Sequence, residues 1–173
     1  MRISPEGFAN KLSRDRKVPI DIISIMDDCG VAFLPERGIE QKNFAGITLV
    51  NDKIRVVSAN NNVRALRKRF ILAHEFGHAL MHGNISGVFI DASFENMVTF
   101  DNVEPKRLRF EKEATRFAIN LLVPKKYLLL DLERQDIKEL FFEDKIDVLA
   151  KKYNVEKWII NYRLAQILND NSF

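Results

Sequence analysis

The chain has 173 residues, of which 46% are hydrophobic and 29% charged, so it is long enough to build one buried core with a solvated surface. Seven glycines and five prolines exclude a collagen-like or low-complexity chain, and a single cysteine, Cys29, excludes a disulfide scaffold. The net charge of +3 is too small to indicate non-specific nucleic-acid binding, and no apolar run approaches the roughly 18 residues of a membrane span. Since the first residues also lack the apolar stretch of a signal peptide, we expect a soluble, cytoplasmic protein.

The first part of the chain predicts a short helix followed by a small sheet. The expected elements are a helix at 20–29 and strands at 31–34, 44–50 and 53–57. Gly30 is placed to end the helix, and Asn51-Asp52 predicts a tight hairpin between the last two strands. The turn at Asn60–Asn62 offers an N-cap to a helix that runs on to Met81.

The second part of the chain is mainly helical. Gly83 is placed to end the helix that reaches Met81, and residues 83–105 are expected to be irregular because Gly, Asn, Ser and Asp are scattered through them. The further expected helices are Leu108–Val123, closed by Pro124, then Tyr127–Leu132, Ile146–Tyr153 and Val155–Leu168. Helices combined with a small antiparallel sheet predict the α+β fold class.

The most informative segment is the run His74-Glu75-Phe76-Gly77-His78. Its two histidines are four residues apart, so both imidazoles project from one helix face and can bind one ion at about 2.0–2.1 Å. Glu75 points to the adjoining edge of that face, where it can reach a water on the metal without binding the metal itself. Apolar residues surround most of this helix, so its polar groups are expected to be buried and to need partners. The pattern therefore predicts a Zn²⁺ site with Glu75 as the catalytic base.

The third protein ligand is expected on the helix that begins at about residue 108. His82 continues the row of histidines, but about 12 Å of helical rise separate it from His74, so we interpret it as a residue that ends the helix or supports a ligand. Glu111 lies at the margin of the buried stripe without a basic neighbour on its own face, whereas Glu113 grades into the charged, solvated face. We therefore predict Glu111 as the ligand, with Glu113 as the alternative. Thr115, one turn after Glu111, is expected to orient its carboxylate by a hydrogen bond.

The two helices resemble the motifs of the ImmA/IrrE family of zinc metallo-endopeptidases. The segments Arg69–His82 and Glu111–Pro124 match these motifs almost throughout, with Thr115 where the family usually has Asn and Val123 where Met is usual. The roles that the resemblance implies are zinc ligation by His74, His78 and Glu111 and general-base catalysis by Glu75. It also implies a zincin-like metallopeptidase core, which we place at residues 1–124, with a C-terminal helical region at 125–173 packed on it.

The resemblance further implies a substrate and a biological context. Such proteins are cytoplasmic endopeptidases, often encoded on phages or mobile elements, that cleave a helix-turn-helix repressor protein and thereby derepress an operon. Because the β-region begins at about residue 31, we expect the stand-alone type, without a DNA-binding domain ahead of the peptidase. The expected partner is therefore a separate repressor polypeptide, and no membrane.

Two other functions stay open. Residues 146–164 resemble a helix-turn-helix, but Trp158, Ile159, Tyr162 and Leu168 are expected to pack on the body or hold substrate, and direct DNA binding is not favoured because the outward face is not strongly basic. A non-catalytic, zinc-containing regulatory module that binds a repressor or DNA through its C-terminal helices would carry the same metal site in its sequence.

Two further features are interpreted as structural. One is a basic cluster that consists of Arg64, Arg67, Lys68 and Arg69. We interpret this cluster as the solvated face of a helix start rather than a phosphate-binding patch. The other is Cys29, beside Gly30, which we interpret as a small structural residue because the histidines that a cysteine nucleophile would need are assigned to the metal.

Overall fold

The computed structural model describes residues 4–35, 45–51, 53–82, 87–91, 93–100 and 103–170. The helices of this part are α1 (Pro5–Ser13), α2 (Ile22–Asp28), α3 (Ala65–Met81), α4 (Phe94–Thr99), α5 (Pro105–Leu122), α6 (Lys125–Leu132), α7 (Gln135–Lys138), α8 (Phe142–Tyr153) and α9 (Lys157–Asp170). The strands are β1 (Ala32–Phe33), β2 (Gly46–Val50), β3 (Arg55–Ala59) and β4 (Gly87–Asp91). Helices with one small sheet agree with the α+β class expected from the sequence. None of the described helices combines the length and the apolar character that crossing a membrane requires.

The described strands form one mixed sheet in the order β1-β3-β2-β4. The expected pairing of the two strands is present as the antiparallel pair β2 and β3, whereas Asp52 of the predicted turn lies outside the described residues. The strand β4 pairs antiparallel with the other side of β2. However, β1 pairs parallel with β3, so a purely antiparallel sheet was the wrong expectation. Gly46, the first residue of β2, lies opposite Ala59 on one side and Asp91 on the other.

Several elements are not predicted by the sequence patterns, namely α1, β4, α4 and α7. The strand β4 and the helix α4 lie within 83–105, the segment expected to be irregular. In β4 the apolar side chains occupy both faces, since Val88 and Ile90 are exposed and Phe89 is buried, so the strand lacks the alternation that would identify it. By contrast, α1 begins with a recognisable N-cap, because the Ser4 side chain accepts a hydrogen bond from the Gly7 N–H at 3.0 Å.

Neither of the two end signals predicted for α3 is confirmed. The N-cap position of α3 is Arg64, which makes no capping hydrogen bond with its side chain, and the Asn60 side chain instead accepts from the Asn62 N–H within the turn. The proposed end signal Gly83 lies outside the described residues, and α3 is followed by His82 as its C-cap. The helix α5 begins at Pro105, three residues before the predicted start, because proline is favoured in the first turn.

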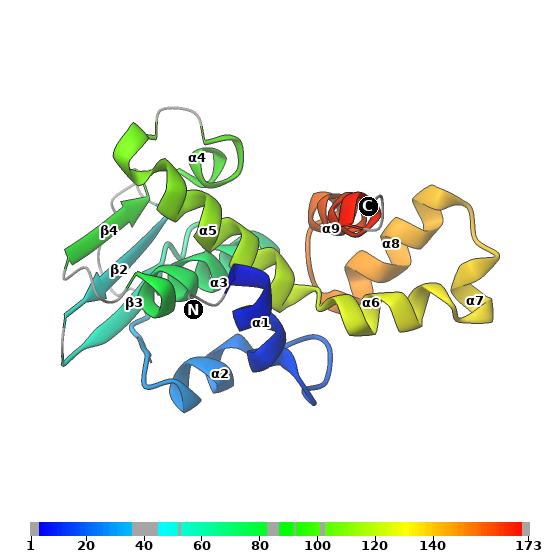
Figure 1. The fold of residues 1–173 in the computed structure, drawn as a ribbon, viewed down its shortest axis with the longest axis horizontal. Helices are drawn as coiled ribbons and strands as arrows, with labels where there is room; N and C mark the ends of the chain where they lie inside the picture. Colours follow the sequence, from blue (N-terminus) through cyan, green and yellow to red (C-terminus); the bar gives the residue numbers. More distant parts are fainter. Residues whose placement is uncertain are drawn as a thin grey trace.

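The central helix α3 lies between the sheet and α5, and Figure 1 shows both helices beside the sheet. All its residues from 70 to 79 are buried. Gly77 permits the close approach of α5, because a Cβ there would lie 3.0 Å from Phe117 Cδ1 and 3.2 Å from Ala114 Cα. On the opposite side, the Thr48 hydroxyl of β2 donates to the Glu75 carbonyl oxygen at 3.0 Å. Both faces of the histidine helix are thus fixed by packing.

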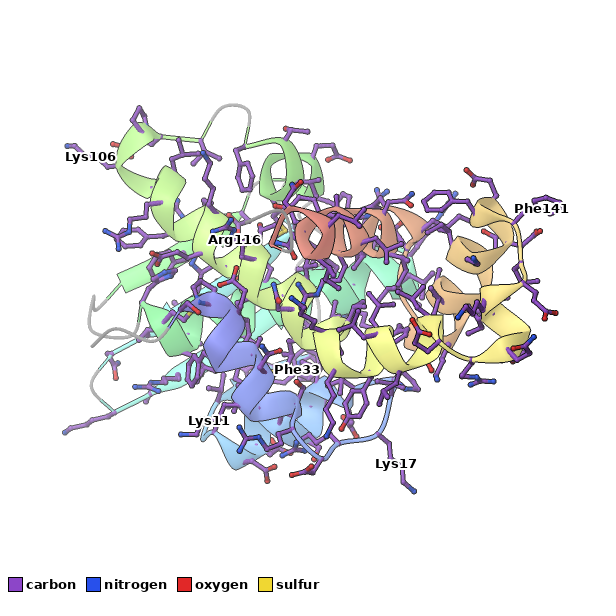
Figure 2. All side chains as sticks on the ribbon, turned by 45° about the vertical axis from the view of Figure 1, so that its right-hand side comes forward. Lys11, Lys17, Phe33, Lys106, Arg116 and Phe141 are labelled. Atoms are coloured by element: carbon purple, nitrogen blue, oxygen red, sulfur yellow. The ribbon has the colours of Figure 1, made fainter. Side chains whose placement is uncertain are left out.

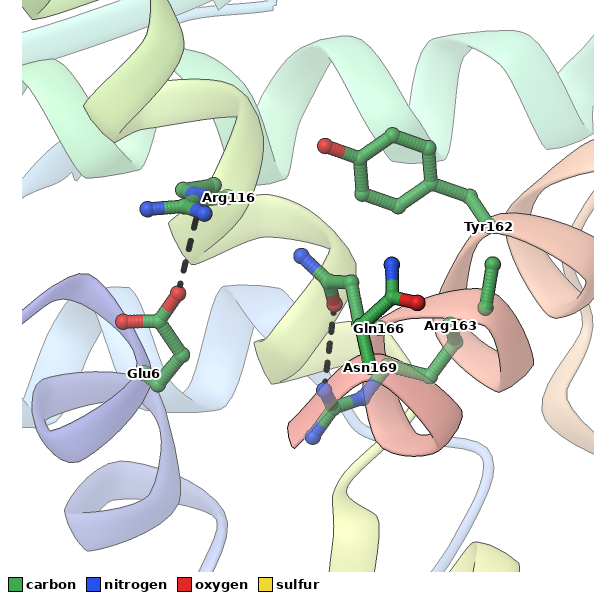
Figure 3. A pocket seen from close by; sticks show the side chains of 7 residues that line it. Glu6, Arg116, Tyr162, Arg163, Gln166 and Asn169 are labelled. Atoms are coloured by element: carbon green, nitrogen blue, oxygen red, sulfur yellow. Dashed lines mark hydrogen bonds and ion pairs between the residues drawn. The ribbon is translucent and has the colours of Figure 1, made fainter. Parts of the chain in front are cut away.

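The C-terminal helices α6 to α9 extend away from the sheet (Figure 1). They contact the rest of the molecule through Trp158, whose ring lies 5.1 Å from that of Phe70 on α3, and through the Arg163 guanidinium, which donates from Nε to the Val123 carbonyl oxygen at 3.0 Å. A cavity of about 580 Å³ remains between α1, α5 and α9, bordered by the Glu6–Arg116 ion pair (Figure 3). The division at residues 1–124 and 125–173 stays a prediction.

Only some of the C-terminal apolar side chains that were expected to pack on the body do so. Trp158 and Ile159 pack inward as expected, whereas Tyr162 and Leu168 are exposed. Among the described residues, the most exposed large apolar side chain is Phe141, before α8, which Figure 2 shows at the far end of the C-terminal helices.

Candidate metal centre

The two histidines of α3 and one glutamate of α5 converge on a single point. The Nε2 atoms of His74 and His78 are 3.0 Å apart, and the Glu111 Oε2 atom lies 3.2 Å from the first and 3.1 Å from the second. All three side chains are buried. Ligands at about 2.0–2.2 Å from a tetrahedral ion stand roughly 3.3 Å apart, so these three atoms have the spacing of a metal's ligands.

A fourth polar group, Asp91 at the end of β4, joins this cluster. Its Oδ2 atom lies 3.4 Å from His74 Nε2 and 4.0 Å from His78 Nε2, and the four ligand atoms, with Glu111, all lie within 4.8 Å of one another. Asp91 is not among the ligands predicted from the sequence, because its segment was expected to be irregular. The only signal is a short apolar run, Val88-Phe89-Ile90, that ends in a carboxylate.

The chemistry of the cluster fits a divalent cation. Two imidazoles and two carboxylates are among the ligand types that Zn²⁺ prefers. The Asp91 Oδ2 atom is buried and has no hydrogen-bond donor among the described residues, a state that costs free energy unless a cation or a donor is supplied. We therefore identify His74, His78 and Glu111, with Asp91 beside them, as the residues that could hold a metal.

The second ring nitrogen of His74 is held by Thr115 on α5. The Thr115 hydroxyl lies 3.1 Å from His74 Nδ1 and donates to the Met97 carbonyl oxygen at 2.7 Å. Since the hydroxyl proton is committed to that carbonyl, Oγ1 accepts the Nδ1 proton of His74, and the lone pair of Nε2 faces the cluster. The expectation that Thr115 orients Glu111 is therefore wrong, because its hydrogen bonds go to His74 and to the backbone.

The two glutamates of α5 differ in position, and neither has the surroundings expected from the helix pattern. Glu111 does have a basic neighbour, since its Oε1 atom accepts from Arg107, one turn earlier, at 3.3 Å. Glu113 is not on a solvated face, because its side chain is only 19% exposed and contacts the His82 ring and Arg109. The structure thus brings Glu111 to the cluster and places Glu113 outside it, beside the third histidine.

Glu75, the predicted base, lies on the sheet side of α3 and is fully buried. Its Oε2 atom lies against the Thr48 hydroxyl, whose one proton is shared between this oxygen and the Glu75 carbonyl oxygen, whereas Oε1 has no donor among the described residues. Gly46 provides the space for this carboxylate, since a Cβ there would lie 2.2 Å from Oε1. The residue opposite Gly46 in the sheet is Asp91, so the sheet brings both carboxylates to the same side of the cluster.

Burial and mutual charge give these groups shifted pKa values in the absence of a metal. Burial, together with the neighbouring Asp91, raises the pKa of Glu75 well above its usual range. Burial alone would lower the pKa of His74, but the negative charges of Asp91 and Glu111 beside Nε2 outweigh this and raise the pKa to about 9, so a metal that binds would displace a proton from Nε2. Burial opposes the ionisation of Glu111 as well, yet its contacts with His74 and His78 hold its pKa far below the usual value. Glu75 is thus the carboxylate of the group with the highest proton affinity.

The basic cluster does not form the solvated face that was expected, because only Arg64 of its four residues is exposed and the others have contacts within the molecule. The Arg67 guanidinium lies 4.2 Å from the centre of the Phe94 ring and pairs with Glu156, while Arg69 donates to the Ile20 carbonyl oxygen. For Cys29, burial raises the pKa of the thiol, which disfavours the nucleophilic thiolate.

Comparison with known proteins identifies the family. The family model described as the IrrE N-terminal-like domain, of the M78 peptidases, matches residues 34–165, which include the whole cluster and Glu75. A search of curated proteins finds no match. Family membership supports a metallopeptidase-type function. Since the match covers most of the chain, the protein belongs to the M78 peptidase family, and the resemblance of its two helices to ImmA/IrrE proteins is confirmed.

Proposed function

We propose that the protein is a zinc-dependent endopeptidase that cleaves a helix-turn-helix repressor and so derepresses a phage or mobile-element operon. The observation that carries the proposal is the convergence of His74, His78 and Glu111 on one point, with Oε1 of Glu75, which has no partner in the described part of the chain, on the adjoining side. A buried set of two imidazoles and one carboxylate beside a second carboxylate of raised pKa has the composition of a metallopeptidase centre. Membership of a peptidase family supports the same reaction class.

In this proposal His74, His78 and Glu111 hold the Zn²⁺. When bound, the ion supplies Lewis acidity, which polarises a peptide carbonyl and lowers the pKa of water from 15.7 to about 7. Thr115 and Arg107 keep the His74 ring and the Glu111 carboxylate in place by hydrogen bonds, so these groups need no reorganisation during the reaction.

The base in the proposed mechanism is Glu75. Because the Thr48 hydroxyl binds Oε2, the other oxygen, Oε1, is the atom that accepts the proton of the attacking water and later passes it to the leaving amide nitrogen. Its raised pKa makes this carboxylate a stronger proton acceptor than an ordinary glutamate. Asp91, adjacent to His74 and Glu75, contributes to that shift.

An extended peptide would lie along β4. This strand is at the edge of the described sheet and carries Asp91 at its end, so a substrate that pairs with its outer edge would bring a peptide bond toward the cluster. A repressor would need an extended segment to bind in this way.

The test is cleavage of the helix-turn-helix repressor encoded beside this protein, with the full-length chain, with and without a chelator. We expect a discrete fragment with zinc, none after chelation, and recovery when zinc is restored. Glu75→Gln should bind zinc like the unaltered protein and lose at least about a hundredfold of the cleavage rate. Cleavage by this variant at the original rate would remove Glu75 from the mechanism.

The same experiment separates the proposal from the alternative of a non-catalytic regulatory module. Binding of the intact repressor by both the unaltered protein and Glu75→Gln, with no fragment from either, would favour that module. Direct DNA binding through α8 and α9 gains no support, because Trp158 and Ile159 pack against the core.

A further inference from the structure

The second ring nitrogen of His78 begins a chain of hydrogen bonds that leads out of the metal centre. His78 Nδ1 lies 3.0 Å from His82 Nδ1, and His82 Nε2 lies 3.0 Å from Glu113 Oε2. The other oxygen of Glu113 accepts from Arg109 Nε at 2.9 Å. Arg109 is exposed, so the chain connects a fully buried ligand to the surface of α5.

The acceptor at the far end of the chain fixes the direction of its protons. An ionised carboxylate only accepts, so Glu113 Oε2 requires a proton on His82 Nε2. In the neutral form of His82, which carries one N–H, Nδ1 is an acceptor and takes the proton of His78 Nδ1. His78 Nε2, the atom that faces Glu111 in the cluster, is then left with a lone pair, which is the form that binds a metal.

The surroundings of the chain make its hydrogen bonds strong and its geometry fixed. The rings of His78 and Phe89 stack with centroids 4.7 Å apart, and Phe110 lies 4.7 Å from His82, so both imidazoles are enclosed by apolar rings. The His82 backbone N–H also donates to the His78 carbonyl oxygen at 3.0 Å, which holds the two residues one turn apart at the end of α3. In such an environment of low dielectric constant a charge-assisted hydrogen bond is stronger than in water.

The other histidine of the cluster has a different support. The chain from His74 runs through the Thr115 hydroxyl and ends on a neutral backbone carbonyl, that of Met97. The chain from His78 runs through a second imidazole and ends on a carboxylate. A negative charge at the end of the chain makes the imidazole a better electron donor, so the two ligands are not equivalent.

We propose that His82 and Glu113 are positioning residues that hold His78 in its metal-binding tautomer and orientation and thereby strengthen the binding of the metal. The proposal rests on the metal centre of the proposed function, but not on the identity of the substrate or on the reaction. It also gives a role to the third histidine, His82, and to Glu113, the alternative ligand predicted from the sequence.

The test compares zinc affinity, measured by competition with a chromophoric chelator, in three full-length variants. We expect Glu113→Gln, which keeps the shape but loses the charge, to weaken zinc binding by about tenfold. His82→Phe, which fills the same space without ring nitrogens, should weaken it toward about a hundredfold. Glu133→Gln is the matched control, because it removes an exposed carboxylate near Lys138 on the C-terminal side, and it should leave the affinity unchanged.

A second measurement tests the protonation of the hydrogen-bond chain directly. In nitrogen-15 spectra of the histidine rings of the zinc-loaded protein, we expect His78 protonated on Nδ1 and His82 on Nε2. In His82→Phe the Nδ1–H signal of His78 should shift or exchange rapidly with water, although a thermal unfolding curve shows a folded protein. If His82→Phe does not fold, Glu113→Gln still decides the outcome, because its side chain is partly exposed and of the same shape.

The possible failures can be told apart. Unchanged zinc affinity in both variants, or a proton on Nδ1 of His82, would contradict the proposed hydrogen-bond chain but not the proposed function. If the unaltered protein binds no zinc, the proposed function is wrong. The hydrogen-bond chain then has no metal ligand to support, so this proposal fails as well.

Discussion

The two sides of the candidate metal centre differ in how completely their polar atoms are paired. On the side of α3 and α5, the outer atoms of the three proposed ligands are all paired, since Nδ1 of His74, Nδ1 of His78 and Oε1 of Glu111 each have a hydrogen-bond partner within 3.3 Å. On the side of β2 and β4, one carboxylate oxygen of Glu75 and one of Asp91 are buried without a donor in the described part of the chain. Unpaired buried oxygens are costly, so the difference between the two sides needs an explanation.

The difference teaches that binding and reaction are placed on different secondary structure. The long helices, packed closely at Gly77, position the residues that would hold the metal and satisfy their outer atoms. The sheet side keeps acceptors for groups that arrive from outside, namely a metal, a water or the N–H groups of a peptide. A change on the helix side should therefore affect metal affinity, and a change on the sheet side should affect turnover at constant metal affinity.

The largest effect should follow the removal of a ligand on the helix side. We expect Glu111→Gln to weaken zinc binding by more than about a hundredfold, because it removes the negative charge among the three proposed ligands, and to do so more than Glu113→Gln. Metal content after gel filtration and chelator competition would measure the two affinities. The reverse ranking would transfer the ligand role to Glu113.

The sheet side can be tested without touching a reactive group. In Gly46→Ala the new Cβ would lie 2.2 Å from Glu75 Oε1, so the carboxylate must move from its place against β2. We expect repressor cleavage to fall by about a hundredfold while zinc affinity stays the same. Leu49→Ala, at an exposed position of the same strand, controls for a general disturbance of β2. A parallel loss of zinc would mean that the two sides are not separable.

The helix side was readable from the sequence because its periodicity is local. A four-residue spacing brings His74 and His78 to one face of any helix, and the buried stripe of α5 indicates Glu111 rather than Glu113. The sheet side was not readable in this way. Asp91 reaches the cluster only through the pairing of β4 with β2, and that pairing depends on contacts between distant segments that no local pattern encodes.

The outer contacts of the ligands were also beyond the sequence. Helical spacing places Thr115 one turn after Glu111, and from spacing alone it was assigned to that neighbour. Its true partner, His74, lies on another helix, so the assignment requires the packing of α5 on α3. The fold class and the ligand-bearing helices follow from patterns within one segment, whereas the groups that support the ligands follow from the tertiary arrangement.

A smaller effect is expected where the two long helices approach each other. In Gly77→Ala the added methyl would lie 3.0 Å from the Phe117 ring and 3.2 Å from the Ala114 backbone. Such overpacking costs about 1–3 kcal/mol, and the better helix propensity of alanine offsets at most about 1 kcal/mol of it. We expect a lower free energy of unfolding in urea, measured with a chelator present so that no metal contributes. An increase in the free energy of unfolding would show that α5 can move away from α3 at no cost in stability. The packing at Gly77 would then not be what makes the helix side rigid.

The smallest effect should come from the neutral support of His74. Thr115→Val keeps the shape of the side chain but removes the hydroxyl, which leaves the Nδ1–H of His74 and the Met97 carbonyl without this partner. We expect zinc affinity to fall by at most about tenfold, and Thr115→Ser, which restores the hydroxyl, to recover it. The hydrogen-bond chain from His74 ends on a carbonyl, whereas that from His78 ends on a carboxylate. The loss of zinc affinity should therefore be smaller than in Glu113→Gln. A larger loss would show that the orientation of the ring, rather than the charge behind it, determines how strongly each histidine binds.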